Sequence, residues 1–237
     1  MRRPLRILGT LLITAGVLTL AWAVVVWQWQ DPFTALYTKW QQHQLSSQYD
    51  KRIQSFDGSI SGASIAAERA SVAGAAKRYR QSSKRGQALG RIRIPRMGVN
   101  MVLVNGTDHD TLKKGPGRDE RTFMPGENRL VYIAGHRTTY LAPFSHIDRL
   151  RTDDRVTIEV PYATFVYAVT RHRIVNATDL SVLRSPRHEL LELQACHPRF
   201  SATHRSLCGL RAARQGPAPG EPAYAIKRSS VDAHVYG

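Results

Sequence analysis

Hydrophobic residues form one unbroken run near the N-terminus. Residues 5–27 are predominantly apolar and carry no charge except Arg6, and as a helix they are long enough to cross about 30 Å of hydrocarbon. Arg2 and Arg3 precede this run and few charges follow it, so the pattern predicts a single-pass membrane helix with a cytoplasmic N-terminus within residues 1–27. Residues 21–23 resemble a signal-peptide cleavage site, but the apolar run continues beyond them, which favours an uncleaved anchor.

The next segment, residues 28–88, changes character. It is rich in Gln, Ser, Ala, Lys and Arg, with few large apolar residues after Trp40. Short helices are compatible with residues 65–80, where alanine is abundant, but no sustained apolar face supports a packed core. We therefore predict an extracellular stalk that acts as a plain spacer.

Short alternating segments from residue 89 onward are typical of a β protein. The strand candidates are residues 91–95, 99–104, 129–134, 156–160, 165–169, 190–196 and 205–210. Many short strands without a long amphipathic helix predict an all-β domain over residues 89–213. We expect a single closed barrel of about eight strands with short helices. The Gly and Pro residues beyond Arg214 predict a flexible tail over residues 214–237.

The formal net charge of +16 makes an anionic partner physically plausible. However, the basic residues are spread through every segment, without a zinc-finger spacing or an RNA-binding aromatic run, so we do not expect nucleic-acid binding. The surface of a bacterial envelope is also anionic. The charge is therefore consistent with adhesion to membrane and wall polymers.

Cys196 is the first candidate for chemistry. It ends an apolar run and precedes a loop, which is a suitable place for a nucleophile. A thiolate attacks a carbonyl well, and neighbouring positive charge from Arg199 or Arg205 would raise the thiolate fraction. If the strands flanking residues 197–204 pair antiparallel, Arg205 faces the same site, where a guanidinium can stabilise an oxyanion. The alternative for Arg205 is a solvated charge at a strand end.

His136 is the candidate proton donor among nine histidines. It follows a predicted buried strand and Gly135, where the absence of a side chain allows close backbone approach. A histidine at a strand end can donate a proton to a leaving amine. Taken alone, such a histidine is more often a structural or surface residue.

Two rival interpretations involve Cys208. A disulfide with Cys196 suits an oxidising exterior, but Cys208 lies three residues after Arg205 and should point to the opposite face of the strand. A zinc site formed by Cys196, His197, His204 and Cys208 has suitable ligand types, yet the spacing matches no common pattern. We therefore expect no metal and no cofactor.

Several short blocks connect these candidates. They are residues 115–117, residues 125–127, residues 135–140 (GHRTTY) with Pro143 and Phe144, residues 147–150 (IDRL), residues 193–200 (LQACHPRF), and Arg205. Over residues 89–211 they resemble the sortases, especially the actinobacterial class E branch. Ala195 departs from the threonine that many sortases have directly before the cysteine.

The resemblance implies an eight-stranded barrel and a catalytic triad of Cys196, His136 and Arg205. Cys196 would attack the Thr-Gly bond of a sorting signal (Leu-Ala-x-Thr-Gly or Leu-Pro-x-Thr-Gly type) on a secreted protein, giving a thioester. His136 would protonate the departing amine, and a cell-wall amine from a peptidoglycan precursor would resolve the thioester. The resemblance also implies that Tyr140, with Thr138 and Thr139, binds the substrate.

Three other functions remain open. They are a pilin-polymerising sortase, a cysteine hydrolase in which water replaces the amine, and a non-catalytic exported barrel that binds anionic wall polymers. In each case the barrel is expected outside the cell, on a protein of the cell membrane. The sequence gives no indication of the oligomeric state.

Overall fold

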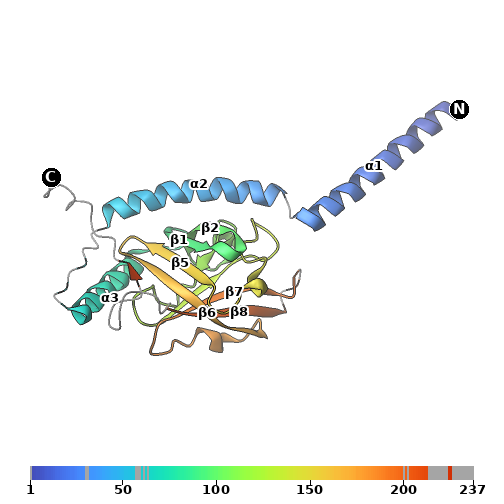
Figure 1. Cartoon of the computed structure of the whole chain (residues 1–237). Helices are drawn as coiled ribbons and strands as arrows, with labels where there is room; N and C mark the ends of the chain where they lie inside the picture. The colour runs from blue at the N-terminus through green and yellow to red at the C-terminus, as the bar shows by residue number, and fades with distance from the viewer. Residues whose placement is uncertain are drawn as a thin grey trace.

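The fold is that of a computed structural model, which describes residues 2–29, 32–56, 60, 62, 64–199, 201, 203–212 and 224–225. Figure 1 shows a long N-terminal helix that projects away from a β-barrel, with two further helices against the barrel. The helices are α1 (Arg2–Trp29), α2 (Pro32–Ser55), α3 (Ile65–Ser82) and the short α4 (His109–Leu112).

The barrel is a closed ring of eight strands. These are β1 (Ala88–Ile94), β2 (Val99–Asn105), β3 (Gly117–Arg118), β4 (Leu130–Ala134), β5 (Arg155–Val160), β6 (Ala163–Asn176), β7 (Leu190–His197) and β8 (His204–Ala212). They are hydrogen-bonded in the order β5-β1-β2-β3-β4-β7-β8-β6, and pairing of β5 with β6 closes the ring. The closed barrel of about eight strands predicted from the sequence is therefore confirmed.

Short elements occupy the connections between strands. They are the 3₁₀ turns η1 (Pro95–Met97), η2 (Ile147–Arg149) and η3 (Leu180–Leu183). A two-residue strand, β9 (Tyr224–Ala225), follows β8. β9 pairs with the first residues of β6, next to the place where β8 ends. The remainder of the predicted tail over residues 214–237 lies outside the described residues.

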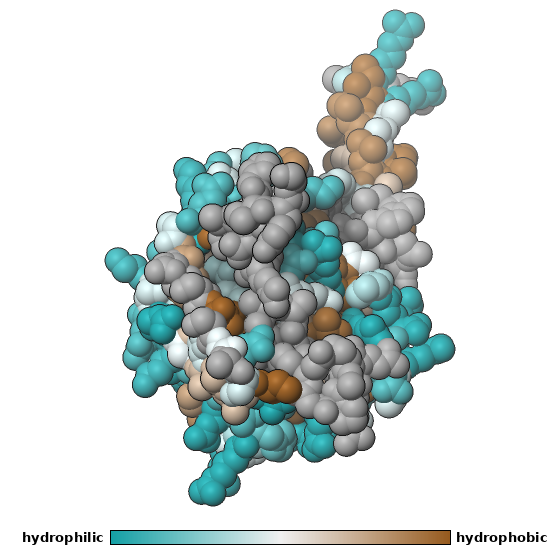
Figure 2. Space-filling model, turned by 60° about the vertical axis from the view of Figure 1, so that its left-hand side comes forward, coloured by the Kyte–Doolittle hydropathy of each residue, from teal (hydrophilic) through white to brown (hydrophobic). Residues whose placement is uncertain are grey.

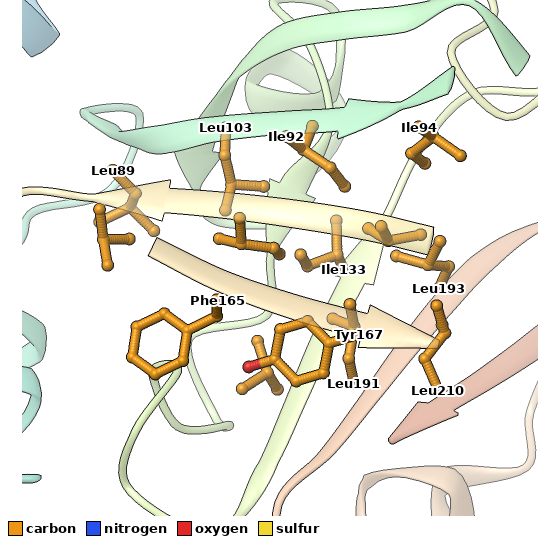
Figure 3. Close-up of a cluster of buried hydrophobic side chains, with 14 of the residues drawn as sticks. Leu89, Ile92, Ile94, Leu103, Ile133, Phe165, Tyr167, Leu191, Leu193 and Leu210 are labelled. Carbon is orange, nitrogen blue, oxygen red and sulfur yellow. The ribbon is translucent and has the colours of Figure 1, made fainter. Parts of the chain in front are cut away.

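Alternation along β7 decides which side chains face the barrel interior. Leu191 and Leu193 belong to the main core, as Figure 3 shows, and Ala195 continues the same row. Successive side chains of a strand point to opposite faces. Glu192, Gln194 and Cys196 are therefore on the outer face of the barrel.

The helix α3 differs from the expected spacer. Val72, Ala75, Ala76 and Tyr79 of α3 are buried within the main core of the barrel. The hydroxyl of Tyr79 donates a hydrogen bond to the backbone oxygen of Leu89 at 2.8 Å. These positions have the i, i+3, i+4, i+7 spacing of a helix face, but two of the four are alanine. The stripe is thus too weakly hydrophobic to reveal a packed helix from sequence.

The helix α2 is also fixed to the barrel and lies across β1 and β2 (Figure 1). The side-chain amide of Gln42 donates to the carbonyl of Val102 at 3.1 Å and accepts from its N–H at 2.6 Å. The hydroxyl of Tyr49 donates to the carbonyl of Glu159 at 3.0 Å. Residues 28–88 are therefore not a plain spacer, although the division of the chain into four parts stays a prediction.

The helix α1 contains the predicted membrane segment. Residues Arg6–Val24 form a 19-residue apolar stretch, none of it buried against the rest of the chain. In Figure 2 the hydrophobic surface is concentrated on this projecting helix. By length and composition the helix is suited to cross a membrane.

Candidate active site

Cys196 and Arg205 face each other across two neighbouring strands. β7 and β8 pair antiparallel with Cys196 opposite Arg205, as expected if the loop between them returns the chain. The Nη1 atom of Arg205 lies 4.0 Å from the Sγ atom of Cys196. The thiol is partly exposed at this edge of the barrel. A guanidinium and a thiol are thus available to the same ligand atom.

His136 reaches the same edge from β4. β4 runs parallel to β7 with Ala134 opposite Gln194, and the N–H of Gly135 donates to the carbonyl of Gln194 at 3.0 Å. His136 follows directly and lines a cavity of about 230 Å³ together with Cys196 and Arg205. The structure therefore brings all three predicted residues to one cavity.

The rest of this cavity is suited to a peptide. Gln194 and Ala134 line it with the three candidates, and apolar side chains from the connection between β6 and β7 also line it. Those apolar residues are Leu180, Val182 and Leu183. A cavity with both reactive groups and apolar side chains in its lining can hold the side chains that precede a scissile bond.

Gly135 and Phe144 fix the backbone at His136. A Cβ atom on residue 135 would lie only 2.7 Å from Cδ2 of the Phe144 ring. The N–H of Phe144 donates to the carbonyl of His136 at 3.0 Å. The loop after β4 therefore folds back over Gly135, which explains why glycine occupies this position.

The surroundings of His136 favour a neutral imidazole. Burial lowers its pKa, and the nearby His109 and Lys113 lower it further. The buried Nε2 atom of His136 has no hydrogen-bond partner among the described residues. Unpaired buried nitrogens are uncommon in native proteins, so this atom is well placed to exchange a proton with a ligand.

Arg137 is a site residue that sequence reasoning missed. It is only 5 % exposed, although it lies in a loop. Nη1 donates to the carbonyl of Cys196 at 3.1 Å and lies 3.2 Å from Nδ1 of His197, and Nη2 donates to the carboxylate of Asp148 at 3.0 Å. Arg137 therefore ties the loop after His136 to the end of β7. The only signal in the sequence was its place directly after His136.

The three predicted substrate-binding residues follow Arg137 in the same loop, but none of them lines the cavity. The ring centroid of Tyr140 is 5.1 Å from that of His136 and 6.5 Å from that of Tyr37. Its N–H donates to the hydroxyl of Thr34 at 3.3 Å. Tyr140 thus packs between His136 and α2, while substrate binding by Tyr140, Thr138 and Thr139 stays a prediction.

The backbone of this loop is strained. Tyr140, Leu141 and Ala142 have φ angles of 53°, 61° and 38°, which residues other than glycine rarely adopt. The N–H of Ala142 donates to the carbonyl of Thr139 at 2.8 Å. Strain of this kind persists where the surroundings impose it and is frequent at functional sites.

Cys208 takes no part in the cavity. Both cysteines are free, and Cys208 is buried in the barrel core opposite Leu193, on the other face of the sheet from Cys196. The side chains of Cys208 and Cys196 therefore point to opposite faces of the sheet, as predicted from the sequence. No group of three or more potential metal ligands occurs in the part of the chain that the structure describes.

Comparison with known proteins identifies similar chains. Residues 92–210, half of the chain, match the model of the sortase domain family. Sortase D of Bacillus subtilis strain 168 is 33% identical over 115 residues, which are 48% of this chain and 56% of that protein. The chain therefore spans just over half the length of this curated relative.

Solved structures agree with this family match. The Clostridium perfringens sortase D5 transpeptidase superposes with a TM-score of 0.53 at 25% identity, covering 70% of this chain and 98% of that one. Sortase E1 from Streptomyces coelicolor, with a tripeptide in its active site, gives a TM-score of 0.50 at 24% identity over 55% of this chain and 90% of that one. The second likeness concerns the fold alone, so assignment to class E stays a prediction.

Proposed function

The chain belongs to the sortase family, and from that premise we propose that it is a cysteine transpeptidase that uses Cys196, His136 and Arg205. The observation that carries this proposal is the position of the three residues on one cavity, with Arg205 directly opposite Cys196. A thiol can act as the nucleophile of an acyl transfer, an imidazole as its acid and base, and a guanidinium as the donor to its oxyanion.

The reaction would proceed in two steps. His136 first takes the proton of the Cys196 thiol. The resulting thiolate attacks the carbonyl carbon of the Thr-Gly bond, and Arg205 stabilises the oxyanion. The C–N bond then breaks, the protonated His136 gives its proton to the glycine amine, and a thioester remains on Cys196. In the second step an amine attacks the thioester and loses a proton to His136, and Cys196 leaves as a thiolate that His136 can reprotonate.

The site of action would be the outer face of the cell membrane. The unburied apolar stretch Arg6–Val24 is suited to anchor the chain, and Arg2 and Arg3 at its start favour a cytoplasmic N-terminus. The barrel would then act on secreted proteins with a C-terminal sorting signal. The acceptor would be the amine of a peptidoglycan precursor, and a signal of the Leu-Ala-x-Thr-Gly type would be preferred.

Trapping of the thioester tests this proposal. The full-length chain in detergent is incubated with sorting-signal peptides that have alanine or proline at the second position, and the adduct is located by mass spectrometry. We expect an adduct on Cys196, faster with alanine, and none with Cys196→Ala. The matched control is Cys208→Ala, which should retain the adduct because burial raises the pKa of the Cys208 thiol to about 12.

Adding an amine acceptor separates the two enzymatic alternatives. A transpeptidase gives a peptide–amine product, whereas a cysteine hydrolase gives the free acid with or without the amine. An adduct that forms equally with Cys196→Ala, or no adduct with the unmodified chain, would contradict the proposal.

A further inference from the structure

A second cavity, of about 490 Å³, lies on the outer face of the barrel beside the candidate active site. Strands β6, β7 and β8 form its floor, and the connection between β6 and β7 forms a wall. Four arginines line it, Arg171, Arg173, Arg184 and Arg211, and Glu192 is the one carboxylate among the described residues that line it. We call it the arginine cavity.

The floor of the arginine cavity is built around Glu192. On β8, Gly209 lies between Arg171 of β6 and Glu192 of β7, and a Cβ on residue 209 would lie 2.9 Å from Nε of Arg171. The missing side chain leaves room for Arg171 to cross the strand. Oε1 of Glu192 lies 3.9 Å from Nη2 of Arg171 and 2.9 Å from Nη2 of Arg173. Glu192 is 1 % exposed, so it holds both guanidiniums in place.

The arginine cavity has an excess of positive charge. Four guanidiniums face one carboxylate, and His188 also lines the wall. Asp119 and Asp179 line the neighbouring active-site cavity, and Asp179 belongs to the same connection between β6 and β7 as Arg184. Hydrogen bonds from Ser181 and the charges of Arg173 and Arg184 lower the pKa of Asp179. Asp179 is therefore ionised at neutral pH and reduces the excess without cancelling it.

The arginine cavity continues the path of the active-site cavity. Val182 lines both, and both follow the outer face of β7. Glu192 and Leu190 lie four and six residues before Cys196, about 13 and 20 Å away at the rise of a β-strand. An extended peptide advances by a similar amount per residue. Its residues about four to six positions from the scissile bond therefore reach the arginine cavity.

The direction of the peptide follows from the proposed role of His136. The leaving amine must meet His136, which reaches the site from β4, on the side of β7 away from β8. The acyl part of the substrate then points away from β4 and runs obliquely along the outer face of β7 toward Glu192, on the side where β8 and β6 help to form the arginine cavity. The four residues of the signal before the scissile bond would lie in the active-site cavity. The residues just before the signal would then reach the arginine cavity.

We propose that the arginine cavity binds acidic side chains of the client protein immediately N-terminal to its sorting signal. This proposal rests on the proposed transpeptidase function. Guanidinium groups bind both carboxylates and phosphates, but the place of the cavity at the end of the peptide path favours a carboxylate that belongs to the peptide itself. Such an exosite selects clients by the segment before the signal, independently of the signal.

Paired peptides test the exosite in the full-length chain in detergent. Both carry the same signal, preceded by two aspartates in one peptide and by two asparagines in the other. The two aspartates would form two partly exposed ion pairs with arginines of the cavity. We therefore expect kcat/KM to be about tenfold higher for the aspartate peptide at low salt, mainly because its KM is lower. Added salt should shrink this ratio.

The informative variant is Arg184→Ala combined with Arg211→Ala, because both residues are exposed and neither holds the buried Glu192. We expect the peptide preference to fall to near parity while cleavage of the asparagine peptide is unchanged. The matched control is Arg187→Ala, an exposed arginine in the same connection that does not line the cavity, and it should keep the preference.

Three results would overturn the exosite. The unmodified chain could cleave both peptides equally, or the double variant could keep the preference. In the third result, the unmodified chain cleaves both peptides equally and is inhibited by inorganic phosphate, whereas the double variant is not inhibited. That result would assign the cavity to a phosphate-bearing ligand instead. Failure of the transpeptidase proposal gives a different result, since neither peptide would then form a thioester.

Discussion

Replacement of Arg137 by methionine should slow catalysis more than it alters substrate binding. The methionine keeps an apolar stem of similar length but loses the bond to the carbonyl of Cys196 and the bond to Asp148. The hydrogen bond to the carbonyl of Cys196 is partly buried, and a carbonyl that loses its donor in such a place costs about 1–3 kcal/mol. The side chain of Asp148 is 60 % exposed, so its lost ion pair adds less than about 1 kcal/mol.

The total loss of about 2 kcal/mol corresponds to a fall in Tm of about 4–8 °C for a chain of this size. Kinetics should change more, because the carbonyl that Arg137 holds belongs to the residue that bears the thiol. A displacement of about 1 Å at a reacting group can cost about 100-fold in rate. We therefore expect kcat for a sorting-signal peptide to fall about 10- to 100-fold with little change in KM.

The assay measures kcat, KM and Tm for Arg137→Met, Arg137→Lys and Asp148→Asn in parallel. Lysine has a single ammonium group instead of the planar guanidinium, so it cannot bond both partners of Arg137 at once. Arg137→Lys should therefore recover only part of the kcat that Arg137→Met loses. The Asp148→Asn control removes only the exposed charge and should leave kcat within about threefold. A normal kcat in Arg137→Met at temperatures well below its Tm would refute the positioning role.

Three other changes test the local physics. Gly135→Ala places a methyl group against the ring of Phe144 and should cost about 1–3 kcal/mol in urea denaturation. By contrast, Gly74→Ala on α3, where the new Cβ would lie at an ordinary contact distance of 3.5 Å from the Arg78 side chain, should stabilise the chain by about 0.5–1 kcal/mol. NMR titration should give His136 a pKa below 6.5, and Lys113→Gln should raise it by removing a nearby positive charge; an unchanged pKa would rule out the contribution of Lys113. Tyr79→Phe removes a buried hydrogen bond and should cost about 1–2 kcal/mol in denaturation; no loss of stability would rule out a stabilising contribution from this hydrogen bond.

The sequence was sufficient to predict the barrel and the meeting of the three candidate residues. Alternating leucines on β7 determine which face bears Cys196, and the short connection between β7 and β8 allows β8 to return antiparallel. Because these relations are local in sequence, the pattern alone could reveal them. The selection of His136 as a catalytic candidate rested on the order of several short sequence blocks that resemble the sortases, and no single pattern was sufficient for it.

Other features depend on contacts between distant segments. Arg137 is buried only because β7 and the loop near Asp148 come together around it, and a loop arginine normally indicates exposure. The arginine cavity exists only once β6, β7 and β8 are neighbours. The alanine-rich face of α3 could not be recognised because small side chains give a weak apolar signal even where they pack closely.

The attachment of α2 to the barrel would restrict the distance between the barrel and a membrane. Two residues separate the end of α1 from the beginning of α2, and α2 is hydrogen-bonded to β2. If α1 spans the membrane, as proposed, the catalytic cleft would stay near the lipid headgroups, because no long flexible tether would connect it to the anchor. A client protein would then be processed while its signal is still close to the bilayer.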